Sequence, residues 1–233
     1  MAIKGNAVLF SEMTPPKGKV RAFNDWYDKH HTPNHVQKVP GFLSAMRYQS
    51  KAGPHFLAVY ELDSAAVLDS AEYRARKFTP DDATRAMLGS VSGFTRTIAA
   101  EAAVFTRKGT TDEALDARVI FCVFFRVPAE RVGEFEDWFD GEHMPTLLEC
   151  EDWLMARRLQ IVESEPEPYT HLMLYYLDDQ TVLNSAALEK ARASEWRRRL
   201  AAEPWFDPHY VTYHRRRGRF FKSGRDARQP GRK

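Results

Sequence analysis

The chain has 233 residues, of which 43% are hydrophobic and 12% aromatic, so it is long enough to bury a substantial core. Its formal net charge of +2 gives no global electrostatic case for a nucleic acid or a membrane as partner. Two cysteines, Cys122 and Cys150, exclude a disulfide framework and stand outside zinc-binding spacings. Because the sequence has no secretion signal and no apolar run near ~18 residues, we expect a cytoplasmic location.

The first half begins with an apolar run at residues 6–13 that stops at two prolines, which is typical of a buried strand. Next, apolar and aromatic residues recur every three or four positions from Val20 to His31, which predicts an amphipathic helix. We expect this helix to end near Pro33, whose ring disfavours helical geometry in the residues before it. Two further strands are predicted at 42–49 and 55–62.

The second half repeats this order of elements. The predicted elements are a strand at 118–127, a helix at 129–143, strands at 153–162 and 170–177, a long helix at 180–201 and a last strand at 209–215. Each half therefore follows the order β-α-β-β-α-β, the ferredoxin-like arrangement of an antiparallel sheet with helices on one face.

One block of sequence occurs twice. Residues 23–33, FNDWYDKHHTP, return as residues 135–145, FEDWFDGEHMP, with six of eleven positions identical where composition alone gives about one. We interpret this as a tandem duplication. The predicted units are 1–110 and 111–218, followed by a basic tail at 219–233 that we expect to be disordered.

The predicted strand at 119–125 is apolar on both faces, so both faces of its sheet must be covered. Packing the two sheets against each other would cover them within one chain. The fold class predicted is therefore α+β, with two ferredoxin-like units packed sheet to sheet as an intrachain barrel around a chamber. A homodimer through exposed helices stays possible.

These residues resemble a known family. The pattern Phe-x-x-Trp-(Tyr/Phe)-Asp-x-x-His-x-Pro, the sequence VPGFL at 39–43 and a basic strand around Arg47 are similar to the dimeric α/β-barrel superfamily, especially its EthD-like members. That superfamily includes cofactor-independent lyases, cyclases, isomerases and monooxygenases, haem enzymes, and proteins without a known reaction. The second half departs from the pattern at 151–153, where Glu-Asp-Trp replaces Pro-Gly-Phe.

The candidate catalytic residues are two helix-borne histidines, a phenol and a strand arginine. His31 and His143 can exchange a proton near neutral pH, although each could instead hold its helix against the sheet. Tyr27 lies one helical turn before His31 and could donate to a developing oxyanion. Arg47, if its strand face points into the barrel, needs a carboxylate from substrate or protein.

The other candidates are aromatic or basic groups expected to line the chamber. The predicted substrate-binding residues are Trp26, His30, Tyr48, Tyr60, Trp138, Arg158 and Tyr176. His30 and His35 occur only in the first half, where with His31 they invite a metal site. We expect no metal, because Pro33 interrupts the helix and adjacent histidines on a helix point about 100° apart.

The favoured hypothesis is a cofactor-independent lyase or isomerase that uses histidine acid–base chemistry on a small apolar, aromatic substrate. A cofactorless monooxygenase would use the same groups. A non-enzymatic small-molecule binder or structural protein is a second class of explanation. A haem enzyme with a histidine axial ligand is a third. Nucleotide cofactors and serine hydrolysis lose support because their motifs are absent from the sequence.

Overall fold

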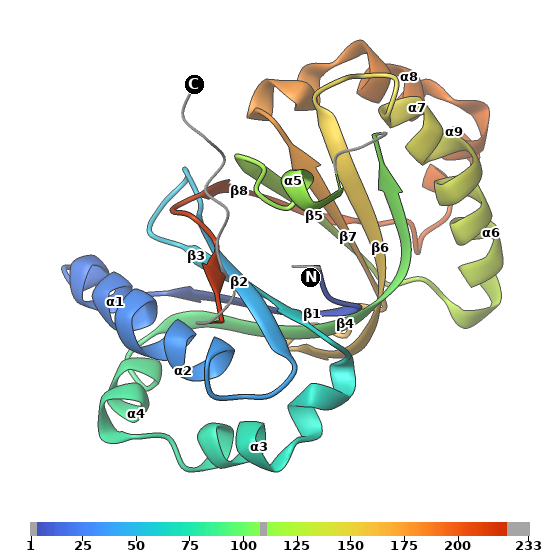
Figure 1. Cartoon of the computed structure of the whole chain (residues 1–233). Coiled ribbons are helices and arrows are strands. Elements are labelled where there is room, and N and C mark those ends of the chain that lie inside the picture. The colour runs from blue at the N-terminus through green and yellow to red at the C-terminus, as the bar shows by residue number, and fades with distance from the viewer. Residues whose placement is uncertain (1–3, 108–110, 223–233) are drawn as a thin grey trace.

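The computed structural model describes residues 4–107 and 111–222, and its eight main strands close into one antiparallel barrel (Figure 1). The strand order is β3-β1-β4-β6-β7-β5-β8-β2, and β2 pairs again with β3. The strands are β1 (Ala7–Thr14), β2 (Phe42–Gln49), β3 (Phe56–Leu62), β4 (Ser92–Thr106), β5 (Val119–Phe125), β6 (Trp153–Glu165), β7 (His171–Leu177), β8 (His209–Arg215) and the short β9 (Phe220–Phe221). The predicted α+β class and the barrel are confirmed.

The two sheets meet at their edges. Strands β4 and β6 pair along most of their length, and β2 pairs with β8 at Tyr48 and Gln49. Each edge of the two four-stranded sheets thereby has a partner strand within the chain, although the β2–β8 pairing covers only two residue pairs. The interpretation of the two halves as tandem copies, with units 1–110 and 111–218, stays a prediction.

The helices within residues 20–88 lie on one side of the barrel and those within 132–201 on the other, whereas the short helix at 111–114 lies between the two groups (Figure 1). The helices of the first half are α1 (Val20–Trp26), α2 (Thr32–Val36), α3 (Ala71–Phe78) and α4 (Asp82–Leu88). The later helices are the short α5 (Thr111–Ala114), α6 (Val132–Trp138), α7 (Met144–Leu147), α8 (Ala186–Ala193) and α9 (Glu195–Ala201). Among the described residues, no helix has both the length and the apolar character needed to cross a membrane.

The helix predicted at 180–201 is broken into three pieces. A 3₁₀ turn covers Gln180–Asn184, and Ser185 and Ser194 then cap α8 and α9 from extended backbone conformations. Each serine hydroxyl accepts a hydrogen bond from the backbone N–H three residues later. Because this capping geometry competes with continuing the helix, serine at these two positions divides it.

The repeated block forms a π turn in both halves. Residues Tyr27–His31 join α1 to α2, and residues Phe139–His143 join α6 to α7, each through a backbone bond from residue i+5 to residue i. The expectation that the first helix ends near Pro33 is wrong, because α2 continues to Val36. Proline lacks the N–H of a regular turn, and the wider π turn before it accommodates that loss.

The barrel interior is filled with side chains, which corrects the expectation of a chamber inside it. Inward-facing residues of β1 and β5, among them Phe10 and Phe124, pack edge to face at 5.4 Å between ring centroids. Tyr48 and Tyr176, predicted to bind substrate, belong to this packed core and are each 1% exposed. The ligand space must therefore lie elsewhere.

A buried ionic cluster closes one part of this interior. The fully buried guanidinium of Arg157 donates from Nε to Glu101 Oε2 at 2.7 Å and from Nη1 to Glu61 Oε1 at 2.8 Å. Its Nη2 donates to the carbonyl oxygen of Gly5 at 3.1 Å. The cluster joins β3, β4 and β6, so it ties the edge of one half to the edge of the other.

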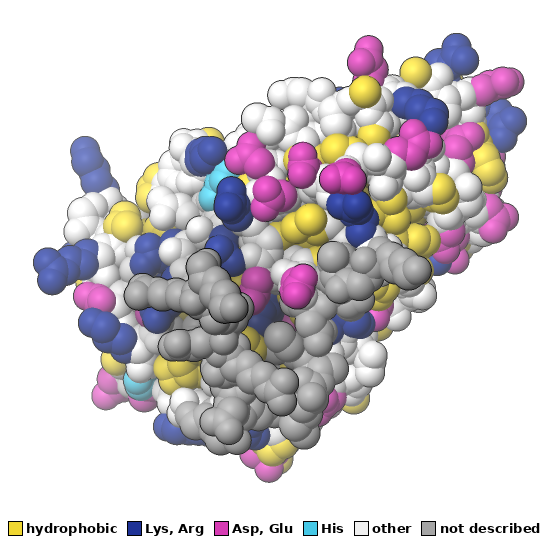
Figure 2. All heavy atoms as spheres, turned by 45° about the horizontal axis from the view of Figure 1, so that its top comes forward, with side chains coloured by type: hydrophobic (Ala, Val, Ile, Leu, Met, Phe, Trp, Pro, Cys, Tyr) yellow, Lys and Arg dark blue, Asp and Glu magenta, His cyan; other side chains and the backbone are white. Residues whose placement is uncertain are grey.

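The predicted tail at 219–233 starts with ordered residues. Phe220 and Phe221 form β9 against Ala45 and Ser44 of β2, and Arg219 donates to Asp116 Oδ1 at 3.1 Å. Residues 223–233 lie outside the described residues. On the visible face of the molecule, basic and acidic side chains are interspersed (Figure 2).

The first prediction concerns Arg157→Met. Removing the guanidinium leaves Glu61 and Glu101 buried without their partner, so we expect a loss of about 3–5 kcal/mol in the free energy of unfolding. Chemical denaturation at pH 7 measures it. The control is Arg118→Met, whose exposed pair with Asp178 spans 3.9 Å and should contribute less than about 1 kcal/mol. Equal losses in the two variants would refute the role of the cluster.

Candidate active site

One cavity lies outside the barrel, between the outer face of the first sheet and its helices. Its volume is about 410 Å³. The lining residues are Leu9, Ser11, Met13, Tyr27, His31, Asn34, His35, Lys38, Tyr60, Tyr73, Arg76, Lys77, Thr79, Pro80, Asp81, Thr84, Leu88, Phe94, Arg96 and Glu165. Strand alternation explains the floor, because Leu9, Ser11 and Met13 of β1 point outward while Val8 and Phe10 point into the barrel.

His31 is held by a column of rings at the π turn. Its ring centroid lies 4.5 Å from Trp26, 4.9 Å from Tyr27 and 4.5 Å from His35. Burial lowers the pKa of His31 well below its usual value, and the nearby His35, His30 and Arg47 lower it further. The His31 imidazole is therefore neutral at physiological pH.

His35 follows His31 by one helical turn and has a defined tautomer. Its Nδ1 lies 2.9 Å from the carbonyl oxygen of His31, which can only accept, so Nδ1 carries the proton. Nε2, on the far side of the ring from the helix backbone, is then an unprotonated acceptor. Burial lowers the pKa of His35, the bond to His31 opposes this, and Arg76 lowers it further.

Tyr73 of α3 brings a phenol to the same cavity. The Nη2 of Arg96 donates to the Tyr73 hydroxyl at 3.4 Å, and Arg96 also pairs with Glu163. Because a guanidinium has no acceptor, the Tyr73 oxygen accepts this bond and its own proton is free for another partner. The ring centroids of Tyr73 and His35 lie 6.0 Å apart and both residues line the cavity, so its wall includes an imidazole acceptor and a phenol donor.

Two of the predicted phenols also belong to this cavity. Tyr27 and Tyr60 line it, and burial raises the pKa of Tyr27 and raises that of Tyr60 well above its usual value. Both hydroxyls are therefore protonated at neutral pH and can act as donors. With His31, they are the predicted residues that the fold brings together around the cavity.

Arg47 lies behind the cavity wall rather than in it. Its guanidinium stacks over the ring of Tyr27 at 4.1 Å and donates to Asp28 Oδ1 at 2.7 Å. Asp28 also pairs with Arg217 at 3.0 Å and Arg216 at 3.4 Å. Arg47 can therefore influence the cavity only through Tyr27 and through its charge.

The remaining predicted residues of the first half frame the site. Trp26 packs against His31, as described above, and is 9% exposed. His30 lies on the outside of the helix, where its Nε2 is 2.8 Å from Asp81 Oδ2 at the cavity rim. Within residues 4–107 and 111–222, no group of three or more His, Cys, Asp or Glu side chains is placed to hold a metal ion.

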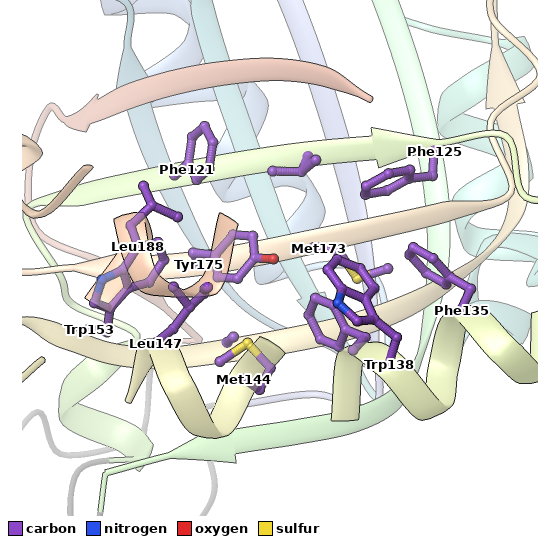
Figure 3. Close-up of a cluster of buried hydrophobic side chains, with 14 of the residues drawn as sticks. Phe121, Phe125, Phe135, Trp138, Met144, Leu147, Trp153, Met173, Tyr175 and Leu188 are labelled. Atoms are coloured by element: carbon purple, nitrogen blue, oxygen red, sulfur yellow. The ribbon is translucent and has the colours of Figure 1, made fainter. Parts of the chain in front are cut away.

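The corresponding region of the second half is filled. Figure 3 shows Trp138, Met144, Leu147, Trp153 and Leu188 packed over the outer face of β5 and β7. The void that remains beside His143 is about 40 Å³, and Leu147 stands where the first half has His35. Burial, with smaller contributions from Arg197 and Arg192, lowers the pKa of His143 to about 3.

The predicted Arg158 is also used by the protein itself. It donates to both carboxylate oxygens of Asp140, at 2.9 and 2.8 Å, and to Glu136. Asn24 replaces Glu136 in the first half, and Arg47 Nε and Nη2 make no hydrogen bond to a described residue. Among the described residues, the two helix ends therefore differ in the number of carboxylates that pair with the strand arginine, and also in the volume of the adjacent cavity.

His35, Tyr73 and Arg96 were not among the predicted site residues. His35 has a detectable signal, because it lies on the face of His31 once the helix is allowed to continue through Pro33. The sequence carries no such signal for Tyr73 and Arg96, since the contact between them depends on how α3 packs on β4.

Comparisons with known proteins identify the fold. No family model matches the sequence, and no curated protein matches it. An anthrone oxidase-like protein of known structure superposes with a TM-score of 0.66 at 12% identity, covering 98% of this chain and 99% of that one. A candidate monooxygenase from Lactobacillus acidophilus superposes with a TM-score of 0.55 at 10% identity, covering 90% and 94%. A candidate chlorite dismutase gives 0.52 at 12% identity, covering 91% and 96%. At these identities the likeness shows a shared fold.

The second prediction concerns the pH dependence of stability through His143. Its pKa is lowered from 6.5 to about 3 by folding, so on acidification the unfolded chain binds this proton first. Stability is therefore lost as pH falls below about 6.5, and His143 accounts for about 2 kcal/mol of that loss by pH 5. In His143→Phe this part of the loss should vanish, as urea unfolding at pH 7 and pH 5 can measure. Leu147→Ala, a packing control in the same cluster, should lower stability at both pH values and keep the wild-type difference.

The third prediction restores in the first half the carboxylate that the second half has. In Asn24→Glu, the new side chain can accept from the free Nε and Nη2 of Arg47, as Glu136 accepts from Arg158. We expect a gain of about 1.5–3 kcal/mol in the free energy of unfolding, the range for bonds to charged groups. Thermal and urea unfolding measure it, with the neutral Asn24→Gln as control. A glutamate variant no more stable than the glutamine variant would contradict the idea.

Proposed function

We propose that this chain is a cofactor-independent acid–base enzyme of the lyase or isomerase kind, acting on a small apolar, aromatic molecule in the first-half cavity. The observation that supports it most is that two neighbouring residues line one cavity: His35, with an unprotonated Nε2, and Tyr73, whose hydroxyl proton is free. A general base must meet the proton it removes, and an oxyanion donor must meet the charge that develops.

The proposed base is the pair of neutral imidazoles. His35 Nε2 takes a proton from carbon, and Tyr73 and Tyr27 donate hydrogen bonds to the oxygen on which negative charge develops. A proton on His35 disfavours a second one on His31, whose ring centroid is 4.5 Å away, so the pair holds one proton at a time. Arg96 acts as a positioning residue because it reaches the reaction through Tyr73.

The cavity favours a small aromatic substrate. Its volume of about 410 Å³ lies in the range of small-molecule sites, and Tyr27, Tyr60, Tyr73 and Phe94 give it aromatic walls. Rings that exclude water strengthen each hydrogen bond to a developing charge. The substrate-binding and catalytic roles of His143, Trp138 and Arg158 lose their support, because their surroundings leave little space for a ligand.

The alternatives share this cavity. An anthrone oxidase-like protein and a candidate monooxygenase have the same fold, and a carbanion formed by His35 could react with oxygen in a cofactorless monooxygenase. A protein that binds the same molecules without reaction is the non-enzymatic alternative. The lyase or isomerase, the monooxygenase and the binder can be distinguished by what each does to a single probe compound.

The fourth prediction tests the reaction with anthrone deuterated at C10 as the probe, under nitrogen. Loss of deuterium to water should be faster with the protein than with buffer, since it requires a base to remove a deuteron from C10 before a proton from water replaces it. His35→Gln and Tyr73→Phe should each lower the rate by about 10²–10⁴-fold, the usual contribution of one acid–base group, with little change in melting temperature. His143→Gln is the matched control and should keep the wild-type rate.

The same samples in air separate the candidate functions. A monooxygenase consumes one O₂ for each anthrone and forms anthraquinone and water, which an oxygen electrode and absorbance follow. Deuterium loss without oxygen uptake supports the lyase or isomerase. Saturable binding without deuterium loss, for anthrone and for a panel of carbon-acidic phenols, would overturn the enzymatic proposal in favour of a binder.

A further inference from the structure

We infer that the natural ligand of the first-half cavity is an aromatic carboxylate, whose ring enters the cavity while its acidic group stays at the mouth against Lys38, Arg76 and Lys77. The inference rests on the cavity named in the proposed function and not on any reaction there. It assigns both a ligand class and an orientation.

Three cations come to one mouth from two adjoining segments. Arg76 and Lys77 lie three and four positions after Tyr73 on α3, so they share the helix face that Tyr73 turns to the cavity. Lys38 follows α2 and lines the same cavity. Arg76 is half-buried, and its Nη1 is fixed by a 2.7 Å bond to the Glu72 carbonyl oxygen.

The protein does not neutralise these cations. Among the described residues, no carboxylate lies within 4.0 Å of the charged atoms of Lys38, Arg76 or Lys77, and Lys77 instead approaches the ring of Phe78 at 5.6 Å. The acidic lining residues come from other elements. Asp81 caps α4 and pairs with His30, while Glu165 ends β6. The fourth lining cation, Arg96, already has Glu163.

The physical chemistry then sets the orientation. Moving a carboxylate into apolar walls costs several kcal/mol unless it is paired there, so an anionic group stays where the cations and water are. A guanidinium with a free edge binds a carboxylate through two parallel hydrogen bonds, and lysines beside it add attraction. The apolar end of the ligand then points inward, toward His35 and Tyr73. The positive charge of Arg76 also contributes to the lowered pKa of His35, as expected when both residues line the same cavity.

The fifth prediction compares two fluorescent probes with nearly the same rings. We use 8-anilinonaphthalene-1-sulfonate, which is anionic, and N-phenyl-1-naphthylamine, which is neutral, in titrations at low salt. The triple variant Lys38→Gln, Arg76→Gln, Lys77→Gln should bind the anionic probe at least tenfold more weakly and the neutral probe within twofold of wild type. Added salt should weaken only the anionic probe.

Two controls make the result decisive. The triple variant Lys17→Gln, Lys19→Gln, Arg21→Gln removes the same charge from exposed positions outside the cavity and should leave both affinities unchanged. Leu88→Trp fills the cavity and should weaken both probes. The inference would be overturned if the variant of Lys38, Arg76 and Lys77 lost affinity for both probes equally. It would also be overturned if the two triple variants lost affinity for the anionic probe equally, or if Leu88→Trp still bound the probes. Binding can be measured without turnover. A protein that prefers the anionic probe but catalyses no deuterium exchange would therefore contradict the proposed reaction and leave the inferred ligand class standing.

Discussion

Closure of eight antiparallel strands around a packed interior is the constraint on which the rest of this structure depends. Once Phe10, Phe124 and their neighbours fill the inside, the cavity of about 410 Å³ lies on the outer face of the first sheet, beneath its helices. The buried ion cluster at Arg157 ties the two halves at their shared edge, because its two carboxylates come from strands of the first half. The barrel thus provides a rigid floor, and the helices decide whether a cavity remains.

The two halves differ in whether a cavity remains between the helices and the sheet. Both place a histidine beside a tryptophan at a π turn, with ring centroids 4.5 and 4.7 Å apart. In the second half, Leu147 and the residues around it pack the space beside His143, whereas His35 and Tyr73 in the first half border an open cavity. In the filled half, apolar contacts hold the helix in place and the imidazole of His143 is packed among them. The open half gives up such contacts and gains a space lined by groups that can exchange protons.

The strand arginines of the two halves differ in the same way. Arg158 is saturated by Glu136 and Asp140, whereas Arg47 has Asp28 and the face of Tyr27. In the inferred ligand site, the cations of α3 lie on the opposite wall of the cavity. Arg76 and Lys77 remain without carboxylate partners among the described residues, and a ligand that brings its own negative charge would complete them.

The sequence by itself determined the element order, the α+β class and the barrel, and it singled out the repeated histidine block, because hydrophobic periodicity and a six-in-eleven identity are local properties of the chain. It also pointed to His31, Tyr27 and Tyr60. Only the tertiary structure decided that the helix passes through Pro33 to bring His35 into the site, because a π turn relieves the proline. Only it decided that Tyr48 and Tyr176 lie inside a packed barrel, since which face of a strand meets the core depends on closure. The approach of Tyr73 to Arg96 likewise depends on how distant segments pack, which no spacing along the chain encodes.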